Sequence, residues 1–153
     1  MITDFLLRHQ WLSPTALVVL VAAAVVAGPR LVSRPRLAKW FAAFSLVPVA
    51  LVTLVPEDRE LFSRCEVQWS VPTPDRVELM ANLVLFVAPV VLFAIATRRP
   101  LLALLVGSGL SALVEALQAA VTALGRSCDT NDWLSNTIGA RQSPLSLTYA
   151  CPS

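Results

Sequence analysis

The amino-acid sequence predicts an all-α integral membrane bundle of four transmembrane helices, followed by a short C-terminal helix at the outer face. The first observation is composition: hydrophobic residues make up 56% of the 153 residues and charged residues only 14%, whereas about 25% of a soluble protein is charged. The second is a mean hydropathy of +0.69. The third is a set of four apolar segments close to the length of about 20 residues that a helix needs to cross a bilayer.

The first two apolar segments lie in the amino-terminal third of the chain. Trp11 to Gly28 is uncharged, and its tryptophan is expected where membrane meets water, because an indole has an apolar body and a polar N–H. A cleaved signal peptide is the less favoured alternative, because the apolar run is long and Gly28-Pro29-Arg30 is a poor cleavage site. Trp40 to Pro56 is also uncharged, and Pro48 is expected to bend this second helix.

The third and fourth segments carry the few polar groups inside the expected membrane region. Leu79 to Thr97 is uncharged and has Asn82 near its start, whereas Leu101 to Gly125 contains a single charged residue, Glu115. Four spans in a chain of 153 residues leave no room for a soluble core. The sequence therefore predicts an integral membrane protein.

The last part of the chain is predicted to differ from the four spans. Asp132 and Asn136 are four residues apart, so they share one helix face, and we expect them on a short helix that dips back into the bundle. Residues 1–140 are expected to form one transmembrane domain. Residues 141–153 are expected to form a short, disordered polar tail.

The distribution of basic residues predicts the orientation in the membrane. The connectors at residues 29–39 and 97–100 contain six of the twelve Lys and Arg residues and none of the ten acidic residues. The positive-inside rule therefore places both connectors in the cytoplasm. The N-terminus, the loop from Pro56 to Glu78 and everything beyond Leu124 are then expected outside.

Two cysteines fall on the side expected to be outside. Cys65 lies in the long loop and Cys128 just after the fourth apolar segment, and disulfides form and persist outside the cytoplasm. We predict a Cys65–Cys128 disulfide that holds the loop over the polar stretch; two unrelated free thiols are the alternative. There is no CxxC spacing, and His9 is the only histidine and is interpreted as interfacial, so the sequence predicts no metal site.

Polar residues are concentrated between Ser111 and Ala140. Glu115 and Gln118 are three residues apart and share a helix face. A carboxylate at the centre of a spanning helix costs roughly 2.5–3.5 kcal/mol on insertion scales, so such a residue is expected to face the bundle interior and to have a partner. If the helix ends near Leu124, Glu115 lies about 14 Å and Gln118 about 9 Å below that end.

Arg126 is the expected counter-ion of Glu115 or of the two aspartates that follow it, and its guanidinium can also bind a ligand carboxylate or phosphate bidentately. Asp129 or Thr130 is expected to cap the short helix, whose amino terminus would favour anions. The alternative is interhelical hydrogen bonding, typically worth under about 2 kcal/mol per bond, beside a solvated loop. The predicted polar cluster consists of Asn82, Glu115, Gln118, Arg126, Asp129, Asp132 and Asn136.

The spacing of these residues resembles the signature of VanZ-like membrane proteins. The resemblance covers about residues 40 to 140 and implies a small multi-span membrane protein that shares this polar set; the founding type is associated with teicoplanin resistance. In the family the final segment opens a fifth span, whereas nothing after Arg141 is expected to cross a bilayer here; a shortened terminus and a frame change near Ala140 both remain open. The matching residues are Thr53-Leu54-Val55-Pro56, Ala81-Asn82-Leu83-Val84-Leu85-Phe86, Glu115-x2-Gln118 and Arg126-x2-Asp129-x2-Asp132-x3-Asn136-x2-Gly139-Ala140.

Three functions are open at this point. The leading interpretation is a cell-envelope protein of the bacterial plasma membrane with an outward-facing polar cleft, which binds a lipid-linked or lipoglycopeptide molecule through Arg126 and the helix amino terminus. The second is an enzyme that acts on a lipid-linked phosphate or amide with Glu115 as general base, and the third is a structural partner of another membrane protein. We expect membrane lipid as a partner and no nucleic acid or cofactor; the sequence indicates neither the substrate nor the oligomeric state.

Overall fold

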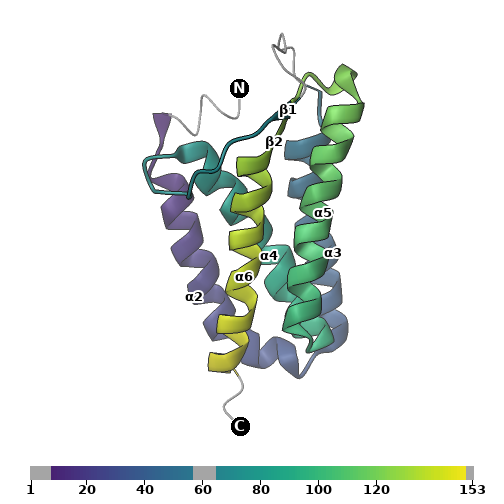
Figure 1. Cartoon of the computed structure of the whole chain (residues 1–153). Coiled ribbons are helices and arrows are strands. Elements are labelled where there is room, and N and C mark those ends of the chain that lie inside the picture. The colour runs from purple at the N-terminus through teal and green to yellow at the C-terminus, as the bar shows by residue number, and fades with distance from the viewer. Residues whose placement is uncertain (1–7, 57–64, 151–153) are drawn as a thin grey trace.

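The computed structural model describes residues 8–56 and 65–150, with side chains described as far as residue 141. Within these residues, five long helices lie side by side in one bundle, and two short strands pair at one end (Figure 1). The elements are α2 (Leu12–Val32), α3 (Pro35–Leu54), β1 (Cys65–Glu66), α4 (Val77–Thr97), α5 (Pro100–Ala120), the 3-10 turn η1 (Thr122–Leu124), β2 (Cys128–Asp129) and α6 (Thr130–Ala150).

Helices α2 to α5 are each long and apolar enough to cross a membrane. The predicted all-α membrane bundle is therefore confirmed. Helices α3 and α5 both begin with a proline, Pro35 and Pro100, at a position where a backbone N–H would have no helical partner. The connectors between α2 and α3 and between α4 and α5 are only a few residues long, so these pairs run antiparallel (Figure 1).

Several predicted helix boundaries shift, and α3 begins at Pro35 rather than Trp40. Helix α2 continues beyond Gly28 to Val32, and the Arg30 side chain donates a hydrogen bond to the carbonyl of Val26 within this extension (3.1 Å). The fourth segment does not stay helical to Gly125, because α5 ends at Ala120 and a 3-10 turn follows. Gly125 closes that turn with a φ of 60°, which glycine adopts without a steric penalty.

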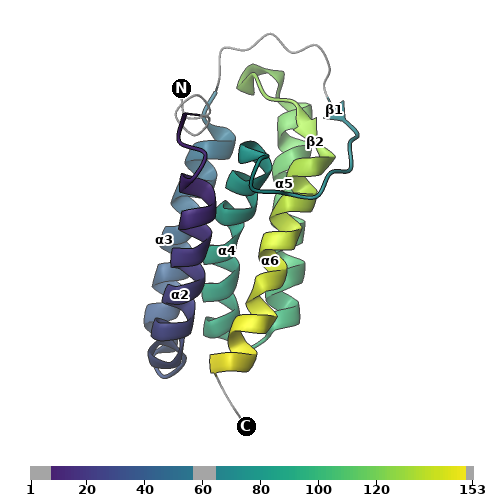
Figure 2. The same cartoon turned by 90° about the vertical axis from the view of Figure 1, so that its left-hand side faces the viewer.

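Helix α4 lies at the centre of the bundle. It packs against α2, α3, α5 and α6, and Figure 2 shows it between the α2–α3 pair and the α5–α6 pair. Phe86, Val87 and Ala94 on α4 are almost completely buried. The outer faces of α2 and α3 expose large apolar side chains instead, among them Val26 and Phe44; such a surface suits contact with lipid.

Helix α6 differs most from the prediction. It has 21 residues and extends to Ala150, so it is not a short helix, and residues 141–150 are helical where a disordered tail was expected; residues 151–153 lie outside the described residues. It runs along the whole bundle, and its C-terminal end lies at the end opposite the strand pair (Figure 1). The expectation that everything beyond Leu124 stays at the outer end is therefore wrong.

Hydrogen bonds to α5 explain why polar residues form this long helix inside the bundle. Asn136 Nδ2 donates to Ser111 Oγ at 2.8 Å, and Thr137 Oγ1 lies 3.0 Å from Ser108 Oγ. A polar group that is hydrogen-bonded to a neighbouring helix can be buried at lower cost than an unbonded one, although Ser135 Oγ and Asn136 Oδ1 are buried without a partner among the described residues. Because hydropathy scores each residue separately, it does not reveal this arrangement, and α6 is not among the four apolar helices.

A close backbone contact joins α4 and α6. A Cβ atom added at Gly139 would collide with the backbone carbonyl oxygen of Leu83. A residue without a side chain is therefore required where the two helices meet, as is common where membrane helices approach closely.

The disulfide between Cys65 and Cys128 is formed, as predicted, with 4.5 Å between the two Cα atoms. Strands β1 and β2 pair in parallel, with Cys65 opposite Cys128 and Glu66 opposite Asp129. The first part of the long loop, residues 57–64, lies outside the described residues. The bridge therefore fixes β1, and the loop that follows it, to the start of α6 (Figure 2).

Side chains of α6 hold the loop after β1 in place. Thr130 Oγ1 donates to the carbonyl of Gln68 (2.6 Å) and accepts from its backbone N–H (2.8 Å). Asn131 Oδ1 accepts from the N–H of Ser70 (2.7 Å). The rings of Trp69 and Trp133 pack edge to face with their centroids 6.4 Å apart.

Candidate functional site

Glu115 points into the end of the bundle that carries the strand pair. It lies on α5, one turn before the helix ends, and is half-buried. Its Oε2 atom accepts a hydrogen bond from the backbone N–H of Asp129 at 2.8 Å. The carboxylate is thus held beneath β2 and links α5 to the start of α6.

Asp129 is the cap of α6. Its Oδ1 atom accepts the backbone N–H of Asn131 at 2.8 Å, which is the usual bond of an N-cap aspartate. Of the two caps considered from the sequence, Asp129 is therefore correct, and Thr130 binds the loop instead. The amino terminus of α6 was expected to receive a ligand anion through its backbone N–H groups. The N–H of Asn131 in this first turn is already bound by the Asp129 carboxylate.

Asp132 is bound from α4. The side chain of Asn82 forms a hydrogen bond with the Asp132 carboxylate, and the positive charge of Arg126 attracts the same carboxylate. Asp129 and Glu78 lie close enough to repel it. Asn82, which was predicted from the third span as a member of the polar cluster, thus contacts Asp132 directly.

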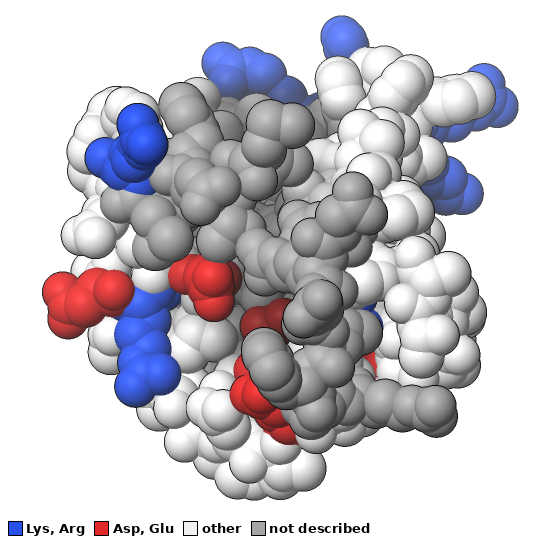
Figure 3. All heavy atoms as spheres, turned by 90° about the horizontal axis from the view of Figure 1, so that it is seen from above, with Lys and Arg blue, Asp and Glu red and all other residues white. Residues whose placement is uncertain are grey.

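The charges of the cluster do not balance. Glu115 is within electrostatic range of both Asp129 and Asp132, and Arg126 is the cation that acts on Asp132. Figure 3, which looks onto this end of the molecule, shows acidic side chains gathered on one side with a basic side chain beside them. Negative charge therefore predominates around Glu115.

The side chains of Gln118 and Arg126 donate hydrogen bonds to carbonyl groups at the C-terminal end of α3. Gln118 Nε2 donates to the carbonyl of Thr53 at 3.1 Å, and Arg126 Nε donates to the carbonyl of Val55 at 3.3 Å. Carbonyl groups in the last turn of a helix have no intrahelical partner, and Pro56 prevents the helix from continuing. These two side chains therefore act as external caps for α3.

The described part of the structure shows no group of three or more His, Cys, Asp or Glu side chains that could hold a metal ion. Comparison with known families gives a match to VanZ/LLP1 over residues 14–141. The chain belongs to the VanZ/LLP1 family. The resemblance predicted from residues 40 to 140 is thus confirmed and extends almost to the start of α2. Comparison with curated proteins and with solved structures gave no match.

In this VanZ/LLP1 protein, the described residues bring most of the predicted cluster together. Five members meet beneath the strand pair through the contacts given above: Asn82, Glu115, Arg126, Asp129 and Asp132. Gln118 lies beside them at the end of α3. Asn136 lies one turn deeper, where it is 4% exposed and binds Ser111.

The structure adds partners that sequence reasoning missed in this VanZ/LLP1 chain. Ser111, which was not among the predicted cluster residues, binds Asn136; its position four residues before Glu115 was the signal that it shares the polar face. Gln68 and Asn131 bind across the loop and the start of α6. No local pattern marked these two, because they are more than 60 residues apart.

Proposed function

We propose that this VanZ/LLP1 protein is a bacterial cell-envelope protein that binds the polar head of an amphiphile, a lipid-linked or lipoglycopeptide molecule, at its polar cluster. One observation carries the proposal: Glu115 stands in an otherwise apolar helix and lies within range of Asp129 and Asp132. Carboxylates are costly at such a depth and mark functional sites in membrane proteins. The apolar helices around the cluster suit the tail of such a ligand.

The charge of the cluster favours ligand groups that donate hydrogen bonds or carry positive charge. Arg126 already donates to the carbonyl of Val55 and faces Asp132, and Asp129 accepts an N–H in the first turn of α6. Recognition of anionic groups by Arg126 and the helix amino terminus, the form expected from the sequence, is therefore less well supported. We propose amine or hydroxyl groups facing Glu115 instead.

We further propose that this end of the bundle faces outward. The connectors at the opposite end carry only basic charges, and the positive-inside rule favours a cytoplasmic position for such connectors. The disulfide at the strand-pair end is consistent with an oxidising exterior.

An enzyme that acts on a lipid-linked phosphate or amide is the second candidate function. The observation that favours it is the proximity of two carboxylates with different surroundings, because Asp132 is bound by Asn82 whereas Glu115 binds a backbone N–H. Such pairs can divide acid and base roles, with Glu115 as general base. A purely structural partner is the third candidate, since Gln118 and Asn136 join helices to one another.

The test compares Glu115→Gln with Asp75→Asn, which removes an equal charge from an exposed position in the loop. Binding of a fluorescent lipoglycopeptide and of a lipid-linked cell-wall precursor is measured with protein in lipid nanodiscs. A charge-assisted hydrogen bond is worth about 1.5–3 kcal/mol, so Glu115→Gln is expected to weaken binding by about ten- to a hundredfold, whereas Asp75→Asn leaves it unchanged.

The three functions give different results in this experiment. Unchanged affinity in Glu115→Gln would contradict the proposed binding site. Retained affinity with loss of precursor turnover would establish the enzyme instead. A lower unfolding temperature with neither effect would leave Glu115 with a structural role only.

A further inference from the structure

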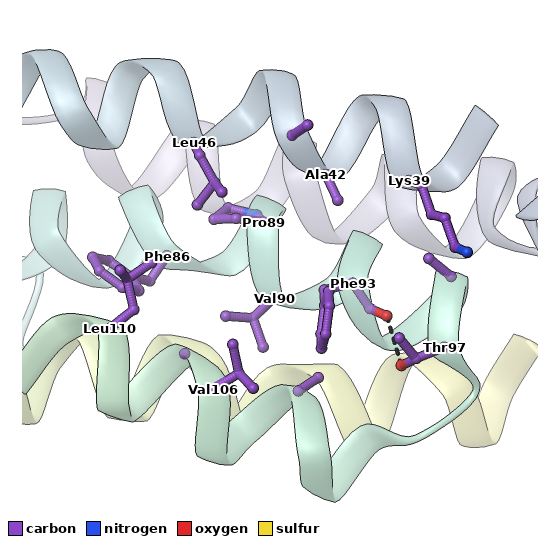
Figure 4. A pocket seen from close by; sticks show the side chains of 14 residues that line it. Lys39, Ala42, Leu46, Phe86, Pro89, Val90, Phe93, Thr97, Val106 and Leu110 are labelled. Atoms are coloured by element: carbon purple, nitrogen blue, oxygen red, sulfur yellow. Dashed lines mark hydrogen bonds between the residues drawn. The ribbon is translucent and has the colours of Figure 1, made fainter. Parts of the chain in front are cut away.

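A second feature lies toward the opposite end of the bundle from the polar cluster. An elongated apolar cavity of about 360 Å³ lies between α3, α4 and α5. Figure 4 shows Lys39 and Thr97 at one end of the cavity and Leu46, Phe86 and Leu110 toward the other. It shares no lining residue with the polar cluster.

The cavity extends over about the depth of one lipid leaflet. Phe86 and Thr97 lie eleven residues apart on α4, which corresponds to about 16 Å along the helix. The hydrocarbon core of a bilayer is about 30 Å thick, so half of it is about 15 Å. A chain lying in the cavity would therefore reach from the membrane surface to about the bilayer midplane.

The cavity opens sideways toward the membrane. Leu46 on α3 and Val106 on α5 line it, and they are 40% and 46% exposed. Ala43, which also lines the cavity, is exposed as well. A lipid chain can therefore enter from the bilayer without displacing a buried side chain.

The charged end of the cavity favours an anionic head group. Lys39 is exposed, and its flexible stem can hold the ammonium at the membrane surface. The connectors at this end add basic side chains and contain no acidic residue. Of these, Arg98 donates to the carbonyl of Val32 (3.3 Å), whereas Lys39 lines the cavity itself.

We propose that this cavity holds one acyl chain of an anionic phospholipid from the adjacent leaflet, with the lipid phosphate paired to the Lys39 ammonium. The apolar lining accommodates the chain, the cavity depth matches the leaflet, and the lysine selects the head group. This site is separate from the amphiphile site proposed at the strand-pair end, and its test does not depend on that site.

The experiment is native mass spectrometry of the full chain, delipidated and then exposed to phosphatidylglycerol or phosphatidylcholine. The wild-type protein is expected to retain one phosphatidylglycerol about fivefold more than phosphatidylcholine, because a basic residue near an anionic lipid surface contributes about this factor. Lys39→Ala is expected to remove the preference, and Lys39→Arg to keep it. Ala43→Phe, which places a ring in the opening, is expected to reduce retention of both lipids.

Arg36→Ala is the matched control, because it removes an equal charge near the start of α3 from a residue that does not line the cavity. It is expected to keep the preference for phosphatidylglycerol. Equal retention of the two lipids by the wild-type protein would overturn the proposal. So would a preference that survives Lys39→Ala, or one that Arg36→Ala removes to the same extent.

Discussion

Glu115 is compatible with an apolar helix because of where its oxygen atoms lie. An unpaired carboxylate in hydrocarbon would be expelled or protonated, yet Glu115 accepts the backbone N–H of Asp129 and lies near the end of the bundle. The side chain of Asn82 on α4 likewise forms a hydrogen bond with the Asp132 carboxylate on α6. Glu115 and Asp132 are thus each held by a partner from another element, which fixes where the site lies.

At the same scale, Gly139 provides a sharp test of the packing. Gly139→Ala should lower the free energy of unfolding by about 1–3 kcal/mol, the usual cost of overpacking, because its Cβ would meet the Leu83 carbonyl. The measurement is the thermal unfolding temperature in detergent. Gly109→Ala is the control, since a Cβ there would meet nothing within 4 Å, and it should be neutral or stabilising by up to about 1 kcal/mol. Equal effects of both substitutions would contradict the α4–α6 contact.

Helix ends in this bundle are completed by other elements. Helix α3 ends at Leu54, and its carbonyls are bound by Gln118 from α5 and Arg126 from the segment after η1. The sequence showed that α3 must end at Pro56 and that Gln118 lies on the face of Glu115. It could not show that Gln118 caps α3, because that bond depends on how α3 and α5 pack in three dimensions.

The contact between Thr130 and Gln68 leads to a prediction at the scale of the loop. Thr130→Val keeps the shape of the side chain but removes both hydrogen bonds to Gln68. Hydrogen–deuterium exchange of the Gln68 amide should therefore become faster by about ten- to a hundredfold if opening then costs about 1–3 kcal/mol less. Thr73→Val, at an exposed position of the same loop, should leave this exchange rate unchanged. Unchanged exchange in Thr130→Val would show that the loop is held elsewhere.

The disulfide joins elements that are far apart in sequence, with a separation of 63 residues. Cys65→Ser/Cys128→Ser should lower stability by about 2–5 kcal/mol, the usual range for removal of a native bridge. The measurement is the unfolding temperature in detergent without reductant, beside peptide mapping of the wild-type protein. Recovery of Cys65 as an alkylated free thiol from the wild-type protein would contradict the bridge.

At the scale of the whole molecule, the sequence predicted the four apolar helices, because their hydropathy is a local property. It failed for α6, where the polar side chains of Asn136 and Thr137 form hydrogen bonds with α5, although Asn136 Oδ1 is buried without a hydrogen-bond partner among the described residues. Hydrogen bonds of this kind between two helices depend on which helix packs beside α6, which a local sequence pattern does not show. The membership of Asn82, Glu115, Asp129 and Asp132 in one cluster was predicted from the sequence, whereas the pairing of Asn82 with Asp132 required the packed bundle.

The arrangement of α6 predicts which ends of the bundle are accessible from each side of the membrane. Single cysteines are introduced at Ser33, Asp75 and Ala150 in a background with the native thiols replaced. Membrane-impermeant maleimide should label Asp75→Cys in intact cells, and should label Ser33→Cys and Ala150→Cys only after permeabilisation, because the last two lie at the end with the basic connectors. Labelling of Ala150→Cys in intact cells would contradict the course of α6.

The two attachments between α4 and α6 limit which motions the bundle can make. Near one end, Asn82 holds Asp132 by a hydrogen bond, and further along, the Gly139 backbone touches that of Leu83. Both attachments start from neighbouring residues of α4 and reach α6 seven residues apart, at Asp132 and at Gly139. Sliding of α6 along α4 would therefore break the Asn82–Asp132 hydrogen bond, so the register between these two helices keeps Asp132 in the polar cluster.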